Sequence, residues 1–288
     1  MILPRTAIVG TGRMGGAMVA RLREAGADLV VYNRTAERAV ATGAPVAKTA
    51  AEAVADAEVV LVSLSDDAAV LAAYDDLIAG LRSGTVVVET STIDPATVQE
   101  LAPRVEATGA ALIDAPVSGS VPLVERGELT FMVGGSAGAL AGARPVLDVL
   151  GRRIVHVGGL GSGAVVKLAV NTVVHALNAA LSEAIVLAER AGVARAMTYE
   201  VLAGSAVAGP FVHYKRAAFE RPEEAPVAFT LHLVAKDLDL ITGLADRVSA
   251  PMSQAETDRR LVREAIEAGL GDRDMSALAE FLRGTVER

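Results

Sequence analysis

The chain has 288 residues, a formal net charge of −8 at pH 7 and no cysteine. This length exceeds that of most single domains, so we expect two domains. A net negative chain lacks the broad positive field with which proteins neutralise nucleic-acid phosphates, and without cysteine it has neither disulfides nor thiolate metal ligands. The four histidines are not spaced as paired ligands. We therefore expect no nucleic-acid partner and no metal.

From the first residues we expect no targeting signal. Its first ten residues contain a Pro, an Arg and a short apolar run, which is too short for a signal-peptide core or a membrane span. We expect a cytoplasmic protein that does not associate with a membrane.

Up to about residue 157, short β-branched runs alternate with helical patterns. The clearest runs cover residues 7–9, 29–32, 59–62 and 86–88. Such alternation is typical of βαβ units around a mainly parallel sheet that is buried on both faces. We predict an α/β fold, with a Rossmann-type doubly wound domain over residues 1–160.

The strand pattern stops near residue 160. Residues from about 162 to 192 predict one long apolar helix, and further helices are expected near 194–205, 228–248, 253–269 and 274–284. We predict an all-helical domain over residues 161–288 that serves substrate binding and dimerisation and is joined to the first by the long helix.

A glycine-rich loop follows the first predicted strand and opens the first helix. Glycines permit a tight turn and let the backbone approach a pyrophosphate at the helix N-terminus. The motif is weak alone, but its place in a βαβ unit favours cofactor binding. The loop consists of Gly10, Thr11, Gly12, Arg13, Met14 and Gly15.

The second strand is followed by Asn33, Arg34 and Thr35, where an NAD enzyme usually carries a carboxylate for the ribose hydroxyls. A guanidinium can bind a 2′-phosphate through paired hydrogen bonds. This segment therefore favours NADP(H) over NAD(H), and a solvated surface arginine is the alternative.

Three further segments, together with the glycine loop, resemble the β-hydroxyacid dehydrogenase family over essentially the whole chain. They are Asp114-Ala115-Pro116-Val117-Ser118-Gly119-Ser120, then Gly161-Ser162-Gly163 leading to Lys167 and Asn171, and finally Lys236-Asp237-Leu238.

The resemblance implies a role for each of these segments. Lys167 would be the catalytic residue, and Asn171 would bind substrate beside it. Ser118, Gly119 and Ser120 would hold the substrate carboxylate. Thr92 and Lys236 would contact the cofactor, and the protein would form homodimers or homotetramers.

The sequence departs from the commonest family pattern at two positions. Val170 replaces the first of two consecutive asparagines, and Ser120 replaces a frequent glycine. Both features resemble the NADP-preferring glyoxylate/succinic semialdehyde reductase branch. We therefore expect an oxidoreductase that interconverts a small carboxylate-bearing aldehyde or ketone and its hydroxy acid.

The spacing of Lys167 and Asn171 supports this chemistry, because residues four apart project from one helix face. Lys167 can then act as general acid or base. Without the resemblance, a lysine that extends its amine into water at a domain edge is the simpler interpretation. His175 continues the same stripe, but a lone histidine on an apolar helix is more often a core residue, so it is not counted in the site.

Two rival functions remain open. Imine reductases share the architecture, although they typically carry Asp or Tyr at the lysine position. A catalytically silent NADP-binding module is the other, and the presence of both Lys167 and Asn171 argues against it.

Overall fold

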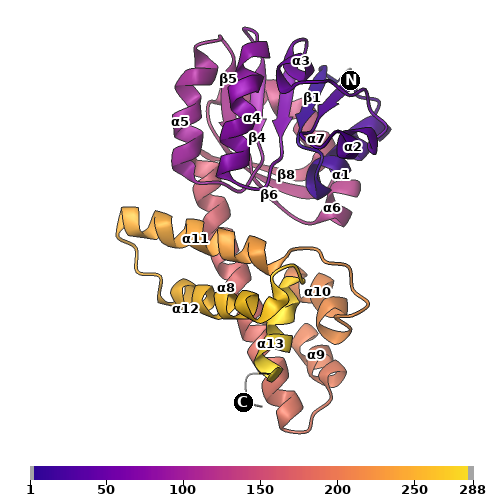
Figure 1. The fold of residues 1–288 in the computed structure, drawn as a ribbon, viewed down its shortest axis with the longest axis vertical. Coiled ribbons are helices and arrows are strands. Elements are labelled where there is room, and N and C mark those ends of the chain that lie inside the picture. Colours follow the sequence, from indigo (N-terminus) through magenta and orange to yellow (C-terminus); the bar gives the residue numbers. More distant parts are fainter. Residues whose placement is uncertain (1–2, 285–288) are drawn as a thin grey trace. The chain divides into compact units, whose positions relative to one another are not determined.

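The computed structural model describes residues 3–284. The chain divides into two compact units, Met1–Lys167 and Leu168–Arg288. The division falls after the domain boundary predicted at residue 160. The predicted Rossmann-type unit and the predicted all-helical unit are both confirmed (Figure 1).

The first unit is built on an eight-stranded sheet with the strand order β2-β1-β3-β4-β5-β7-β6, in which β8 also pairs with β7. Strands β1 to β5 are parallel, and β7 runs antiparallel to β5 and β6. The strands are β1 (Thr6–Val9), β2 (Leu29–Tyr32), β3 (Val59–Val62), β4 (Val86–Glu89), β5 (Ala111–Asp114), β6 (Val117–Ser118), β7 (Leu129–Gly134) and β8 (Gly151–Gly158).

Alternate strand residues enter two separate hydrophobic cores, because successive side chains of a strand point to opposite faces. Ile8 of β1 packs with helices α1 (Arg13–Glu24) and α7 (Ala137–Leu150). Ala7 and Val9 pack with α3 (Ala50–Val54), α4 (Asp67–Gly80) and α5 (Pro95–Glu106). Burial on both faces explains why these strands are continuously apolar in the sequence.

The helices of the first unit begin where the sequence supplies capping side chains. Thr49, Asp66, Asp94 and Ser136 each accept a hydrogen bond from a backbone N–H of the first turn that follows. The helices are α1 (Arg13–Glu24), α2 (Ala36–Val40), α3 (Ala50–Val54), α4 (Asp67–Gly80), α5 (Pro95–Glu106), α6 (Val121–Glu125) and α7 (Ala137–Leu150).

The long helix α8 (Ser162–Arg190) starts in the first unit and continues into the second. The predicted helices are present, and α10 is an additional helix that the sequence pattern did not reveal. The remaining elements are α9 (Arg195–Ala203), α10 (Pro210–Glu220), α11 (Leu231–Val248), α12 (Ser253–Ala265), a π-helical turn η1 (Ile266–Leu270), a 3-10 turn η2 (Met275–Ala277) and α13 (Leu278–Gly284).

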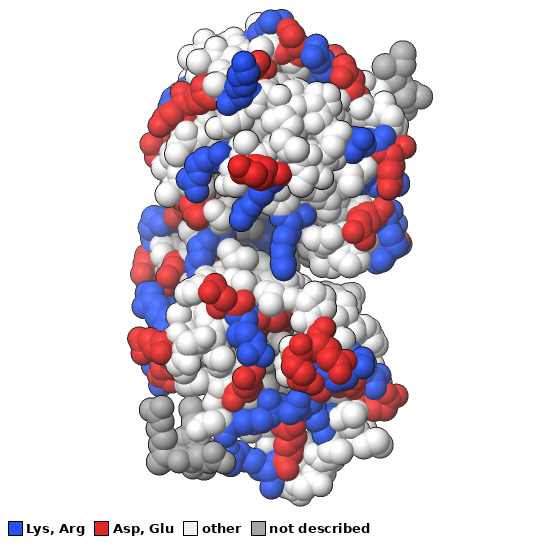
Figure 2. All heavy atoms as spheres, turned by 45° about the vertical axis from the view of Figure 1, so that its right-hand side comes forward, with Lys and Arg blue, Asp and Glu red and all other residues white. Residues whose placement is uncertain are grey.

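Helix α8 is long and apolar enough to cross a membrane by length and composition alone. In the structure, however, its residues Leu168, Leu181 and Ile185 are buried in the hydrophobic core of the helical unit. One face of α8 therefore belongs to that core. Figure 2 shows acidic and basic side chains interspersed over the visible face of the protein.

Candidate active site

The glycine loop after β1 has the geometry of a dinucleotide-binding turn. Gly10 has a φ of +96°, and a Cβ there would collide with the backbone of Ser63. A Cβ at Gly15 would collide with the Gly10 carbonyl. Gly12, in contrast, has no atom within 4 Å of its Cβ position, and no side chain caps α1. Open backbone at the uncapped N-terminus of a 12-residue helix fits the binding of a pyrophosphate.

Asn33 ties this loop to the end of β2. Its Oδ1 accepts a hydrogen bond from the Thr11 backbone N–H at 3.0 Å, and its Nδ2 donates to the Thr35 carbonyl at 2.9 Å. Arg34 and Thr35 are exposed beside it. The amide of Asn33 therefore holds the loop in place, while the next two side chains are available to a ligand.

Within the glycine loop, the two side chains after Gly12 lie differently. Arg13 is exposed, whereas Met14 is half-buried and packs against the hydrophobic core. The contribution of Met14 is therefore packing, in addition to any contact that its backbone makes.

A buried carboxylate fixes the segment that precedes Thr92. Glu89 is 1% exposed at the end of β4, and its Oε1 accepts a hydrogen bond from the Ser91 backbone N–H at 2.9 Å. The Ser91 hydroxyl in turn accepts from the Leu64 backbone N–H at 2.8 Å. Burial raises the pKa of Glu89 to about 7, although hydrogen bonds from Ser91 oppose the rise. The sequence analysis assigned no role to Glu89. A charged residue at the end of an apolar strand is the feature that could have indicated one.

The predicted carboxylate-binding residues form a turn between β6 and α6. Ser118 pairs with Thr130 of β7, and Gly119 follows with a φ of +141° that strongly favours glycine. Ser118 and Ser120 are half-buried. The turn therefore presents two hydroxyls that flank an exposed glycine.

Asp114 anchors the start of α8. Its Oδ1 accepts a hydrogen bond from the Gly161 backbone N–H at 2.8 Å, and its Oδ2 accepts from the Ala164 backbone N–H at 2.7 Å. Burial raises the pKa of Asp114, and the backbone hydrogen bonds oppose that rise. The carboxylate thus caps the helix that carries Lys167, a role that sequence reasoning did not assign.

Lys167 lies in the second turn of α8 and is half-buried. Asn171 follows one turn later and is 6% exposed. The helix therefore fixes the spacing of the amine and the amide, as predicted from the sequence.

In the helical unit, the carboxylate of Asp237 in α11 lies close to three polar side chains. Its Oδ2 accepts a hydrogen bond from Asn171 Nδ2 at 2.6 Å, and the same oxygen lies 3.5 Å from His175 Nε2. Lys236 Nζ lies 3.0 Å from Oδ1. Lys236 and Asp237 are therefore not a solvated surface pair, because the Asp237 side chain is buried.

Tyr214 and Lys215, which lie near the middle of α10, are neighbours with different surroundings. Lys215 is 3% exposed and pairs with Asp274 at 2.7 Å, whereas Tyr214 is half exposed. The buried ion pair gives Lys215 a packing role within the helical unit.

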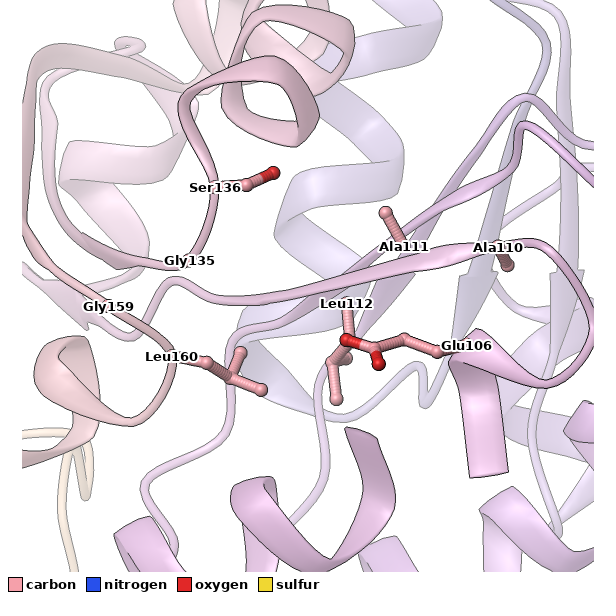
Figure 3. A pocket seen from close by; sticks show the side chains of 8 residues that line it. All are labelled: Glu106, Ala110, Ala111, Leu112, Gly135, Ser136, Gly159 and Leu160. Atoms are coloured by element: carbon pink, nitrogen blue, oxygen red, sulfur yellow. The ribbon is translucent and has the colours of Figure 1, made fainter. Parts of the chain in front are cut away.

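One pocket of the first unit lies away from these residues. It has a volume of about 360 Å³, and Figure 3 shows Glu106, Ser136 and Leu160 among the side chains that line it. No predicted site residue lines it. Among residues 3–284, no group of three or more His, Asp or Glu side chains is arranged to hold a metal.

Comparison with known proteins accounts for both units. Residues 5–158 match the family described as the NAD binding domain of 6-phosphogluconate dehydrogenase. Residues 161–282 match the family described as NAD-binding of NADP-dependent 3-hydroxyisobutyrate dehydrogenase.

Individual relatives cover nearly the whole chain. Glyoxylate/succinic semialdehyde reductase 2 of Arabidopsis thaliana is 32% identical, over 97% of this chain and 80% of its own length. The NAD-dependent L-serine dehydrogenase of Pseudomonas aeruginosa is also 32% identical, over 98% and 99%. The solved structure of Mycobacterium tuberculosis 3-hydroxyisobutyrate dehydrogenase with L-serine has a TM-score of 0.86 at 31% identity, covering 99% of this chain and 100% of that one.

These matches confirm the family resemblance drawn from the motifs and extend it to both units. The chain belongs to the β-hydroxyacid dehydrogenase family of NAD(P)-dependent oxidoreductases.

Proposed function

We propose that this protein is an NADP-dependent reductase of small carboxylate-bearing aldehydes or ketones, such as glyoxylate or succinic semialdehyde, with Lys167 as its general acid and base. The observation that carries the proposal is the anchoring of Lys167. Asp114 caps the start of its helix with two hydrogen bonds, and Asn171 follows one turn later.

Two parts of the first unit support NADP as the cofactor. The backbone of Gly10–Gly15 offers N–H donors for the pyrophosphate, and the exposed Arg34 and Thr35 offer donors for a 2′-phosphate. Thr92 and Lys236 are further proposed contacts. Because the family includes a relative named as NAD-dependent, the preference needs a direct test.

A bound nicotinamide would supply the hydride for reduction and accept it in oxidation. In reduction, Lys167 Nζ donates a proton to the carbonyl oxygen of the substrate, and in oxidation it accepts the proton of the hydroxyl. Asn171 orients that oxygen. The hydroxyls and backbone N–H groups of Ser118–Ser120 bind the substrate carboxylate without a counter-charge.

The proposal is tested by following absorbance at 340 nm with NADPH and, separately, NADH. The substrates are glyoxylate, succinic semialdehyde, methylmalonate semialdehyde and a cyclic imine, and Lys167→Ala is compared with the wild type. Turnover of a carbonyl substrate with NADPH that is lost in Lys167→Ala supports the proposal. Imine turnover that survives in Lys167→Ala contradicts the role of Lys167, and tight NADPH binding without turnover favours a silent module.

We also propose that the protein self-associates as a homodimer or homotetramer. Large apolar side chains are exposed on two helices of the second unit, with Leu187 of α8 73% exposed and Val201 of α9 68% exposed. Light scattering of the wild type and of Leu187→Glu tests this proposal. A monomeric wild type would contradict it.

A further inference from the structure

His175 is a buried polar side chain to which the proposed chemistry assigns no task. It is 3% exposed on α8, one turn after Asn171, and its ring lies 6.2 Å from that of Phe229 between centroids. Within residues 3–284, neither ring nitrogen has a hydrogen-bond partner. Burying an imidazole in this way costs free energy that an apolar side chain would not.

The ring lies beside the carboxylate that holds Asn171. His175 Nε2 is 3.5 Å from Asp237 Oδ2, the oxygen that accepts the Asn171 Nδ2 hydrogen bond at 2.6 Å. The other oxygen of Asp237 is 3.0 Å from Lys236 Nζ. Asp237 is fully buried, so these side chains replace the water that its charge would otherwise attract.

A second buried carboxylate, Asp258 of α12, interacts electrostatically with His175. Burial raises the pKa of Asp258, and interaction with His175 opposes that rise. Asp258 is also held by Gln254 at 2.8 Å and is repelled by Glu183. His175 therefore interacts with two buried carboxylates, Asp237 of α11 and Asp258 of α12.

The amide of Asn171 can work in only one orientation here. Because Asn171 Nδ2 donates to Asp237, the carbonyl oxygen Oδ1 of Asn171 remains available to accept a hydrogen bond from another donor. The flipped amide would place Oδ1 against a carboxylate oxygen, which is repulsive. Whatever fixes Asp237 Oδ2 therefore also fixes which atom Asn171 offers to a substrate.

We propose that His175 is a positioning residue of this reaction: the polar contact of its Nε2 with Asp237 Oδ2, 3.5 Å away, holds that oxygen and thereby keeps the Asn171 amide in its working orientation. The proposal rests on the proposed function of Lys167 and Asn171 and assigns His175 no contact with the substrate. Its action passes through Asp237 alone.

Three variants separate positioning from packing. His175→Phe keeps the ring volume and the contact with Phe229 but removes the N–H, so we expect kcat to fall by about 10- to 100-fold while the NADPH dissociation constant is unchanged. His175→Gln places an amide N–H near the position of Nε2 and should restore most of kcat. Ser182→Ala, which removes another buried polar group of α8, should leave kcat unchanged.

A double-mutant cycle with Asn171→Ala tests whether the effect passes through Asn171. In that background His175→Phe should change kcat by less than about twofold. Equal losses in both backgrounds would mean that His175 acts independently of Asn171, and the proposal would be wrong.

A spectroscopic measurement tests the positioning without turnover. The side-chain amide signals of Asn171 are identified in a ¹⁵N–¹H correlation spectrum by their absence in Asn171→Ala. We expect His175→Phe to shift them and His175→Gln to return them, with no shift in Ser182→Ala. If the wild type turns over no carbonyl substrate, the proposed function fails, yet these signals still decide the positioning. Unshifted Asn171 signals in His175→Phe would overturn the proposal.

Discussion

Asp114 and Ala164 are joined by a 2.7 Å hydrogen bond that runs from the backbone N–H of Ala164 in the first turn of α8 to a buried carboxylate oxygen at the end of β5. A second bond from Gly161 uses the other oxygen. The start of the helix that carries Lys167 is therefore held by a capping residue of the Rossmann sheet.

Replacing Asp114 tests this dependence. Asp114→Asn keeps the shape but turns one acceptor into a donor facing a backbone N–H, so we expect a loss of about 2 to 3 kcal/mol in the free energy of unfolding. We also expect a lower kcat with NADPH binding retained. Denaturant unfolding and steady-state kinetics measure the two effects.

Ser136→Ala is the matched control, because Ser136 caps α7 through the Ala139 backbone N–H at 3.1 Å. It should lower the free energy of unfolding by about 1 kcal/mol and leave kcat unchanged. An unchanged kcat in a folded Asp114→Asn protein would show that the cap does not position Lys167.

Glu89 should make stability depend on pH. Its pKa is raised by burial from 4.5 to about 7, so between these values the folded protein binds more protons than the unfolded chain. The free energy of unfolding contributed by this group therefore falls as pH rises through that window, by about 3 kcal/mol in total. Glu89→Gln cannot ionise and should flatten this part of the curve.

The measurement is urea unfolding at several pH values from 4.5 to 8. Glu24→Gln, which changes an exposed carboxylate, serves as the control and should keep the wild-type slope. Identical slopes for the wild type and Glu89→Gln would contradict the assignment.

The folds of both units could be predicted from the sequence, because their signals are local. Continuous apolar runs mark strands buried on both faces, and the glycine loop lies directly after one of them. Lys167 and Asn171 are fixed relative to each other by a single helix. The predicted strands, the long helix and the family are confirmed for these reasons.

The residues that sequence reasoning missed depend on pairs that are distant in the chain. Asp114 caps a helix about fifty residues later, and Asp237 holds an amide 66 residues earlier. Lys215 forms an ion pair with Asp274, which lies 59 residues later in the chain. No local pattern connects such partners, so their roles follow only from the folded structure.

Arg34 should determine the preference between the two cofactors. Hydrogen bonds to a charged group contribute about 1.5 to 3 kcal/mol, so Arg34→Ala should raise the NADPH dissociation constant by about 10- to 100-fold. The NADH dissociation constant should change by less than about twofold, because NADH carries no 2′-phosphate. Fluorescence titration with each cofactor measures both constants, and Lys48→Ala provides a control for general loss of positive charge. Equal weakening of the two cofactors would remove Arg34 from the 2′-phosphate site.

Gly12 and Gly15 should respond oppositely to a single added methyl group. Gly12 has a φ of −66° and no atom within 4 Å of its Cβ position, so Gly12→Ala should leave the free energy of unfolding within about 0.5 kcal/mol of the wild type. The methyl group would instead occupy the space into which a pyrophosphate approaches, and we expect NADPH binding to weaken by about 10-fold or more.

In Gly15→Ala the new methyl group meets the backbone of Gly10, so we expect a loss of about 1 to 3 kcal/mol in the free energy of unfolding. Gly16→Ala is the control, since the nearest atom to its Cβ position is 3.7 Å away and alanine favours helix. It should be at least as stable as the wild type. The two effects are separated by measuring unfolding without cofactor and NADPH binding by titration on the same proteins. A Gly12→Ala variant that is stable and binds NADPH normally would mean that the pyrophosphate does not approach the backbone at Gly12, and the assignment of this loop to the cofactor would have to be abandoned.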